Sequence, residues 1–90
     1  MVNTIRVYPH EYMDRAKKDV FVADHIAYIT LKRIMSFLND KLGSISYEDI
    51  STNESYEIRL KHVDDQTLQE IKWMFPNVHC WMNYAHLNAY

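Results

Sequence analysis

The sequence predicts an α+β fold in which four antiparallel strands form one sheet and two helices cover one face of it. Three observations predict this fold. Four short segments alternate apolar and polar residues, as half-buried strands do. Two longer segments repeat apolar residues at spacings of three and four, as amphipathic helices do. Along the 90 residues these segments follow one another as strand, helix, strand, strand, helix, strand.

The first predicted strand spans residues 3–8, NTIRVY, where Ile5 and Val7 alternate with polar neighbours. Pro9 ends it, because proline has no N–H to donate to a neighbouring strand. Residues 10–22 show no clear period, and we interpret them as an irregular connection. Within it YMDRAKKD could form a helical turn, and the VFV that follows could be extended.

The first predicted helix spans residues 24–42. Asp24 or Asp19 can cap its start by accepting hydrogen bonds from N–H groups of the first turn. Gly43 can end it, because glycine readily adopts the left-handed backbone that closes a helix. The predicted buried face holds Ala27, Leu31, Ile34, Leu38 and Leu42, and the opposite polar stripe holds His25, Lys32, Ser36 and Asn39.

Residues 44–50 and 56–63 alternate and are joined by the polar sequence STNES, which predicts a β-hairpin. Asp64 can cap a second helix over 64–76, with Val63 and Leu68 in the positions of a hydrophobic staple. Its predicted buried stripe is Leu68, Ile71 and Phe75. A fourth strand follows at 78–84, with Val78, Cys80, Met82 and Tyr84 facing inward.

This order of elements is that of the ferredoxin-like βαββαβ fold. It places the first and third strands at the centre of the sheet, the fourth beside the first and the second beside the third. Right-handed crossovers put both helices on one face. We therefore expect a single domain over residues 1–90 whose other sheet face is open to water or to a partner.

The open face is predicted to carry both aromatic and charged side chains. They are Arg6, Tyr8, Ser46, Glu48, Glu57, Arg59, Lys61, His79, Trp81 and Asn83. Aromatic faces that stack bases and cations that pair with phosphates suit single-stranded RNA or DNA. The RNA-recognition motif uses this face in the same topology, but YEIRLKHV lacks its glycine-containing signature. An ordinary solvated face, with Glu57 or Glu48 paired to Arg or Lys, is the other interpretation.

A protein interface is a third interpretation, because Trp, Tyr and Arg are enriched at binding hot spots. Trp73 lies about 200° around the second helix from Ile71, which turns it away from the sheet. Residues 83–90 could instead fold back over a tryptophan. The partner-binding candidates are Arg6, Tyr8, Arg59, Lys61, Trp73, His79 and Trp81; Glu48, Asp49, Glu54 and Glu57 form a predicted acidic patch, which is either a contact for a basic partner or a solvated loop region.

No catalytic or metal-binding pattern stands out. His79 and Cys80 are neighbours on a predicted strand and so point to opposite faces, which argues against a shared metal. Cys80 is expected to be buried and therefore inert. The chain has one glycine, so it lacks a phosphate-binding loop of the kind found in acylphosphatase, an enzyme with this element order. We expect no enzyme activity, no metal and no cofactor.

The sequence thus favours a small non-enzymatic protein that acts by protein–protein interaction. The chain is rich in Tyr, Met and Asn and poor in Gly. This style is typical of phage or mobile-element accessory proteins that inhibit a host factor. A single-stranded RNA or DNA binder is the alternative, and a homodimer is a further possibility. One cysteine, no long apolar run and no apolar signal core together predict a cytoplasmic protein.

Overall fold

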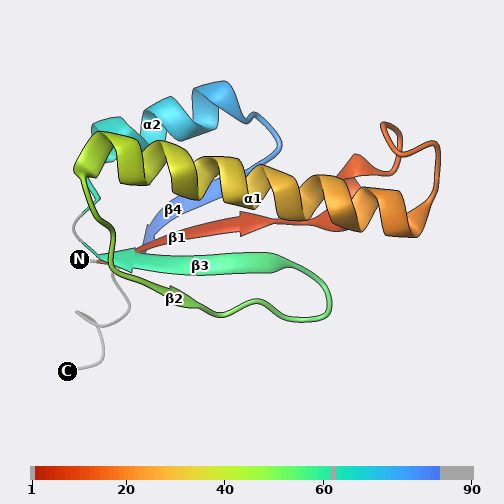
Figure 1. The fold of residues 1–90 in the computed structure, drawn as a ribbon, viewed down its shortest axis with the longest axis horizontal. Helices are drawn as coiled ribbons and strands as arrows, with labels where there is room; N and C mark the ends of the chain where they lie inside the picture. The colour runs from red at the N-terminus through yellow and green to blue at the C-terminus, as the bar shows by residue number, and fades with distance from the viewer. Residues whose placement is uncertain (1, 62, 84–90) are drawn as a thin grey trace.

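A computed structural model describes residues 2–61 and 63–83 (Figure 1). Its strands and helices follow one another in the predicted order, with one short 3₁₀ helix added after the first strand. The elements are β1 (Val2–Val7), η1 (Pro9–Tyr12), α1 (Val20–Leu42), β2 (Tyr47–Asp49), β3 (Tyr56–Lys61), α2 (Asp65–Met74) and β4 (His79–Asn83).

The four strands form one antiparallel sheet in the order β2-β3-β1-β4, and both helices lie on the same side of it (Figure 1). Ile5 in the central strand β1 stands opposite Ile58 of β3 and Cys80 of β4. The predicted ferredoxin-like α+β architecture is therefore confirmed, including the placement of β1 and β3 at the centre.

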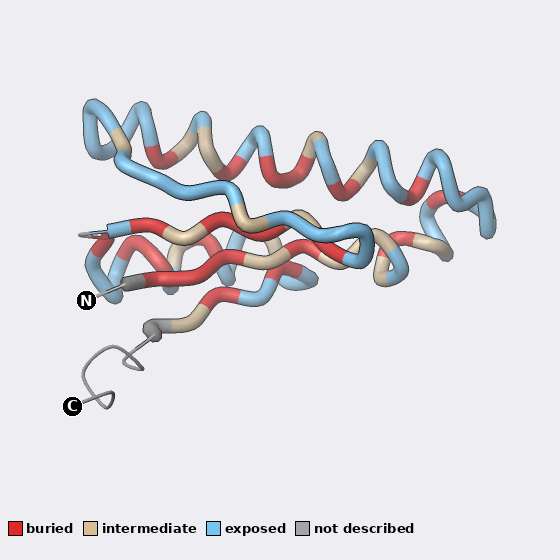
Figure 2. The backbone as a smooth tube through the Cα atoms, turned by 90° about the horizontal axis from the view of Figure 1, so that it is seen from below, coloured by how far each residue is buried: buried red, intermediate tan, exposed pale blue. Residues whose placement is uncertain are grey.

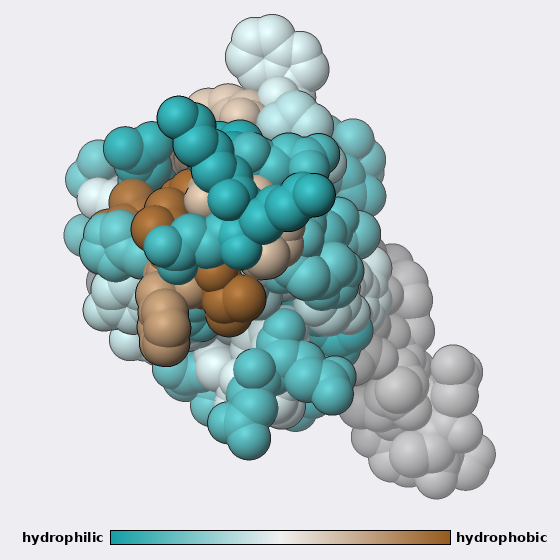
Figure 3. Space-filling model, turned by 90° about the vertical axis from the view of Figure 1, so that its right-hand side faces the viewer, coloured by the Kyte–Doolittle hydropathy of each residue, from teal (hydrophilic) through white to brown (hydrophobic). Residues whose placement is uncertain are grey.

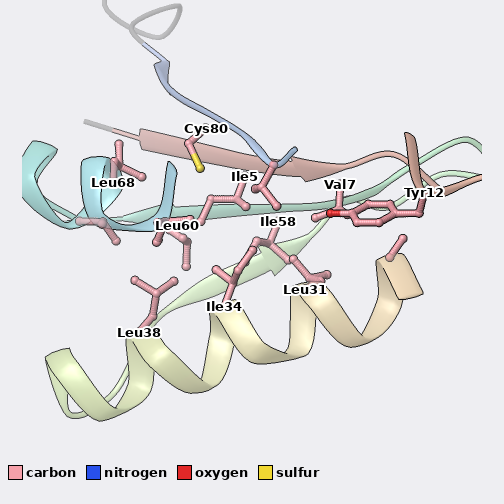
Figure 4. Close-up of a cluster of buried hydrophobic side chains, with 14 of the residues drawn as sticks. Ile5, Val7, Tyr12, Leu31, Ile34, Leu38, Ile58, Leu60, Leu68 and Cys80 are labelled. Carbon is pink, nitrogen blue, oxygen red and sulfur yellow. The ribbon is translucent and has the colours of Figure 1, made fainter. Parts of the chain in front are cut away.

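The core lies between the helix layer and the sheet (Figure 4). Ile34 and Leu38 of α1 meet Ile5, Ile58 and Leu60 of the two central strands. Figure 2 shows the same pattern along α1, where buried positions recur on the side that faces the strands. Fully burying a side chain of this size contributes about 1.5–3 kcal/mol, so these few residues hold the layers together.

The helix α1 begins at Val20, four residues earlier than predicted. Asp19 is its N-cap, and its carboxylate accepts hydrogen bonds from the backbone N–H groups of Phe21 at 3.0 Å and Val22 at 3.2 Å. Of the two predicted caps, Asp19 is thus the one used. The prediction that VFV could be extended is wrong, because these two bonds fix it as the first helical turn.

The connection between η1 and α1 contains two adjacent residues in the left-handed backbone region, Lys17 at φ 53° and Lys18 at φ 66°. The backbone N–H of Lys18 donates to the carbonyl of Met13 at 2.8 Å, and that of Asp19 donates to Ala16 at 3.0 Å. A residue with a side chain is strained in this conformation, at a cost of order 1–3 kcal/mol. The hydrogen-bonded turn therefore holds a strained backbone directly before the cap of α1.

Leu42 differs from its prediction: it is 40% exposed, whereas the four other residues of the predicted face are buried. At 100° per residue Leu42 lies about 60° around the helix from Ala27, farther than any of the others. It also stands in the last turn, immediately before Gly43, whose φ of 84° ends the helix as predicted. The polar stripe of α1 is exposed, as expected.

The hairpin strands are shorter than predicted. The strand β2 covers only Tyr47–Asp49, and all three residues are exposed. Its alternating sequence does not produce burial because β2 is an edge strand. The strand β3 ends at Lys61, and His62, which belongs to the predicted strand 56–63, lies outside the described residues.

The second helix, α2, is capped by Asp64, whose carboxylate accepts a hydrogen bond from the backbone N–H of Thr67 at 2.9 Å. Hydrogen bonding from the Thr67 side chain, followed by this bond from its backbone N–H, lowers the pKa of Asp64. Leu68 and Ile71 are buried as predicted, whereas Phe75 is half-buried because it caps the helix end.

In β4 Cys80 is buried as predicted, and Tyr84 lies beyond the described residues. No helix in the described part of the chain has an apolar stretch long enough to cross a membrane.

Candidate functional site

The register of the sheet decides which side chains meet on its open face. In β1, Thr4 stands between Arg59 of β3 and Trp81 of β4. Arg6, two residues on, stands between Glu57 of β3 and His79 of β4. Side chains directly opposite one another on a sheet are close enough to interact. The predicted open-face residues of the three strands are therefore brought together.

Arg6 is the hub of this face. Its Nε donates to Glu57 Oε1, and its Nη1 donates to the Tyr8 hydroxyl at 2.7 Å. Its guanidinium also lies 4.9 Å from the centre of the Trp81 ring. The hydrogen bond to Glu57, followed by that to Tyr8, raises the pKa of Arg6. One cation thus binds one anion and contacts two aromatic rings, which leaves this part of the open face internally satisfied.

Glu57 consequently differs from the other members of the predicted acidic patch. It is only 9% exposed and is engaged with Arg6, so little of it is offered to a partner. Glu48, Asp49 and Glu54 are exposed. The hydrogen bonds that Ser51 donates to Asp49 lower the pKa of that carboxyl. The acidic patch is therefore a surface of three carboxylates on β2 and the loop after it.

His79 belongs to a second small network beside Arg6. Its Nε2 lies 2.7 Å from Glu11 Oε1, which connects β4 to η1. The Tyr8 ring stands edge-on to His79 at 5.3 Å and tilted to His10 at 5.2 Å. These contacts order the predicted candidates Tyr8 and His79 within the fold, although His79 stays exposed and Tyr8 is half-buried.

Arg59 and Lys61 form no ion pair among the residues that the structure describes. They line a hollow of about 160 Å³ together with Ser46, Tyr47 and Glu48. Arg59 Nε is buried and has no hydrogen-bond partner. A donor in this state favours an acceptor supplied from outside, such as water or an anion.

Trp73 lies apart from the open face. It is 84% exposed on α2, within the helix layer on the opposite side of the sheet (Figure 1). The prediction that it turns away from the sheet is confirmed. Its neighbours on the surface are Gln66, Gln69, Glu70 and Lys72, so the indole projects from a polar surrounding.

A further surface, missed by the sequence reasoning, lies at the start of α1. Val20, Phe21 and Val22 are all exposed, Phe21 by 86%. Beside them is a pocket of about 500 Å³. We call the three residues and this pocket the α1 end surface; the pocket is lined by Tyr8, Pro9, His10, Met13, Val20, Ala23, Asp24, Asn53 and Glu54. Figure 3 shows this end of the molecule, where hydrophobic side chains gather within a hydrophilic surround.

One signal could have revealed this surface. If α1 starts after Asp19, Phe21 falls on the same side of the helix as His25 and Lys32, which belong to the predicted polar stripe. A phenylalanine on a polar stripe is an exposed apolar residue. The signal was hidden because VFV, as three consecutive apolar residues, fits a buried strand equally well.

The described side chains offer little catalytic chemistry. Burial raises the pKa of the Cys80 thiol to about 11, so the thiol is protonated at neutral pH and a poor nucleophile. No group of three or more His, Cys, Asp or Glu residues in the described part of the chain is placed to hold a metal ion.

Comparison with known proteins adds no functional assignment. No protein-family model and no curated protein matches this sequence.

Proposed function

We propose that this protein is a small non-enzymatic binding protein that acts by protein–protein interaction, with the α1 end surface as its main contact. One observation carries the proposal: Phe21 is 86% exposed in the first turn of α1, next in the chain to Val20, which lines an apolar pocket of about 500 Å³. An exposed phenyl ring usually adds little to folding stability, whereas aromatic side chains are enriched at protein interfaces.

The state of the open face supports this choice over the sheet. Arg6 is held by Glu57 and covers part of Trp81, so the central cation and the indole there already satisfy each other. Among the described residues no corresponding contact satisfies Phe21, which is 86% exposed. Trp73, exposed on α2, is the second candidate contact. The open-face candidates Arg6, Tyr8, His79 and Trp81 then serve chiefly to fix the sheet.

We propose a cytoplasmic protein, because the single cysteine of the chain is buried and suits a reducing compartment. A phage or mobile-element accessory protein that inhibits a host factor is the proposed role, and composition supports it. Self-association through the exposed aromatic residues would instead give a homodimer, which size measurement in solution would detect.

The test is a pull-down from cell lysate with the wild-type protein, Phe21→Ser and Trp73→Ser, each with and without nuclease. The two variants are matched, since each removes one aromatic side chain that is more than four-fifths exposed. We expect a protein that survives nuclease and is lost with Phe21→Ser but retained with Trp73→Ser. With the purified partner, Phe21→Ser should weaken binding tenfold or more. Equal retention by all three proteins, or no nuclease-resistant protein, would contradict the proposal.

A single-stranded nucleic-acid binder is the second candidate, favoured by Arg59 and Lys61, which form no ion pair with another described residue and line the same hollow. Arg59→Ala and Lys61→Ala should then weaken binding to a similar extent and flatten its dependence on salt. Lys32→Ala, on the exposed face of α1, is the matched control. Salt slopes equal to that of the wild type would remove this candidate.

A further inference from the structure

We propose that the pocket of the α1 end surface binds a basic segment of the partner protein, with an apolar side chain in the pocket and an adjacent Lys or Arg on Asp24 and Glu54. This inference deepens the proposed function and rests on it. It assigns a chemistry to the partner, which exposure of Phe21 alone does not do.

The walls of the pocket would recognise the apolar side chain of the partner segment. Pro9, Met13, Val20 and Ala23 line the pocket from η1, the following turn and the first turns of α1. A volume of about 500 Å³ exceeds what a single side chain needs and lies in the range of ligand-binding pockets. The pocket therefore has room for one large apolar side chain together with part of its neighbours.

The basic half comes from the charges. Two acidic residues, Asp24 and Glu54, line the pocket, and its described lining includes no Lys or Arg. They reach it from different elements, Asp24 from α1 and Glu54 from the loop between β2 and β3. Lys17 and Lys18, although close in sequence, are not among the lining residues. A cation next to an apolar anchor complements this arrangement.

Asp24 is fixed in place before any partner arrives. The Tyr56 hydroxyl donates to Asp24 Oδ2 at 2.8 Å, and among the described residues the other oxygen, Oδ1, accepts no hydrogen bond. An oriented carboxylate with one unused oxygen can accept from a Lys or Arg at little ordering cost.

The segments around the pocket are also held by backbone hydrogen bonds. Glu11 N–H donates to Tyr8 at 3.1 Å within η1, and Lys18 N–H donates to Met13 at 2.8 Å in the next turn. Thr52 N–H donates to Ser55 at 2.9 Å in the loop that carries Glu54. A pocket formed in advance loses little entropy on binding, so it can recognise a short segment.

The test is selection of random 12-residue peptides displayed on phage against the wild-type protein, followed by affinity measurement with the synthesised peptides. The pocket variant is Asp24→Asn with Glu54→Gln; the new amide oxygen can still accept from Tyr56. The control is Glu48→Gln with Asp49→Asn, which removes the same charge from exposed positions outside the pocket.

We expect the selected peptides to place Lys or Arg beside Leu, Ile, Met or Phe. Their affinity should fall at least tenfold with the pocket variant, change less than twofold with the control, and decrease as salt is added. Peptides without a basic residue, equal losses in both variants, or no peptide that depends on the pocket would overturn the inference. A partner from the lysate that depends on Phe21 but binds through acidic residues would also overturn it, and would leave the proposed function standing.

Discussion

Arg6 occupies the centre of the open sheet face, where it contacts Glu57, Tyr8 and Trp81. Replacing it with Met would leave the Glu57 carboxylate nearly buried without its donor. We expect Arg6→Met to lower the free energy of unfolding by an amount near the lower end of about 1–3 kcal/mol. The loss is small because solvent screens the partly exposed guanidinium. Urea denaturation would measure the loss.

The paired change tests the reason for that loss. Arg6→Met with Glu57→Leu replaces the ion pair by two apolar side chains and should recover stability relative to Arg6→Met alone. If the effects of Arg6→Met and Glu57→Leu alone simply add in the double variant, Arg6 and Glu57 are not energetically coupled.

The raised pKa of Cys80 predicts how the free energy of unfolding depends on pH. Burial raises the pKa of its thiol to about 11, against an ordinary value of 9.0. Between about pH 9 and 11 the unfolded chain therefore loses this proton before the folded one does. A higher pH thus favours unfolding in this window, and below it the contribution is fully present.

We expect the fall in unfolding free energy between about pH 7 and 10.5 to be smaller in Cys80→Ala than in the wild type. Tyr12 and Tyr56 also have raised pKa values, but both are present in the two proteins, so their contributions to the pH dependence cancel in the comparison. Labelling of Cys80 by a thiol reagent should likewise follow global unfolding. Fast labelling of the folded protein at neutral pH would show that the thiol is accessible.

At the scale of elements, the turn before α1 holds the clearest strain. Lys18 adopts φ 66°, where glycine carries no steric cost. Lys18→Gly should relieve strain of order 1–3 kcal/mol and lose part of it to the greater entropy of the unfolded chain. We expect a net gain of about 1 kcal/mol in the free energy of unfolding.

Lys18→Ala is the matched control, because it removes the same charge and keeps a Cβ. Thermal unfolding of both variants separates backbone strain from charge. A glycine variant no more stable than the alanine variant would mean that the left-handed backbone costs nothing here.

The same turn marks where prediction from the sequence stopped. The caps at Asp64 and Gly43 were predictable because each precedes or follows a periodic run. The start of α1 was not, because Val20, Phe21 and Val22 are all apolar and carry no period. Their exposure follows only from the cap at Asp19, which was one of two possibilities in the sequence.

At the scale of the whole molecule, the topology followed from element order and the handedness of crossovers, and the strand order confirms it. The pairing of Arg6 with Glu57 could not be predicted from element order, because the open face offered several basic partners for each acid. Only the register of β1 against β3 selects that pair. The α1 end surface needed three segments, η1, the start of α1 and the hairpin loop, to meet in space. Periodicity within one segment cannot report such a meeting.

Residues that hold the molecule together should respond to substitution differently from those that it offers to a partner. Ile34 is fully buried between α1 and the sheet, and Ile34→Ala should cost about 2–5 kcal/mol. Phe21→Ser and Trp73→Ser remove larger side chains, yet both are exposed, so each should stay within about 0.5 kcal/mol of the wild type. Urea denaturation of the three variants tests this directly. If Phe21→Ser costs as much as Ile34→Ala, Phe21 supports the fold, and the binding proposal loses the observation on which it rests.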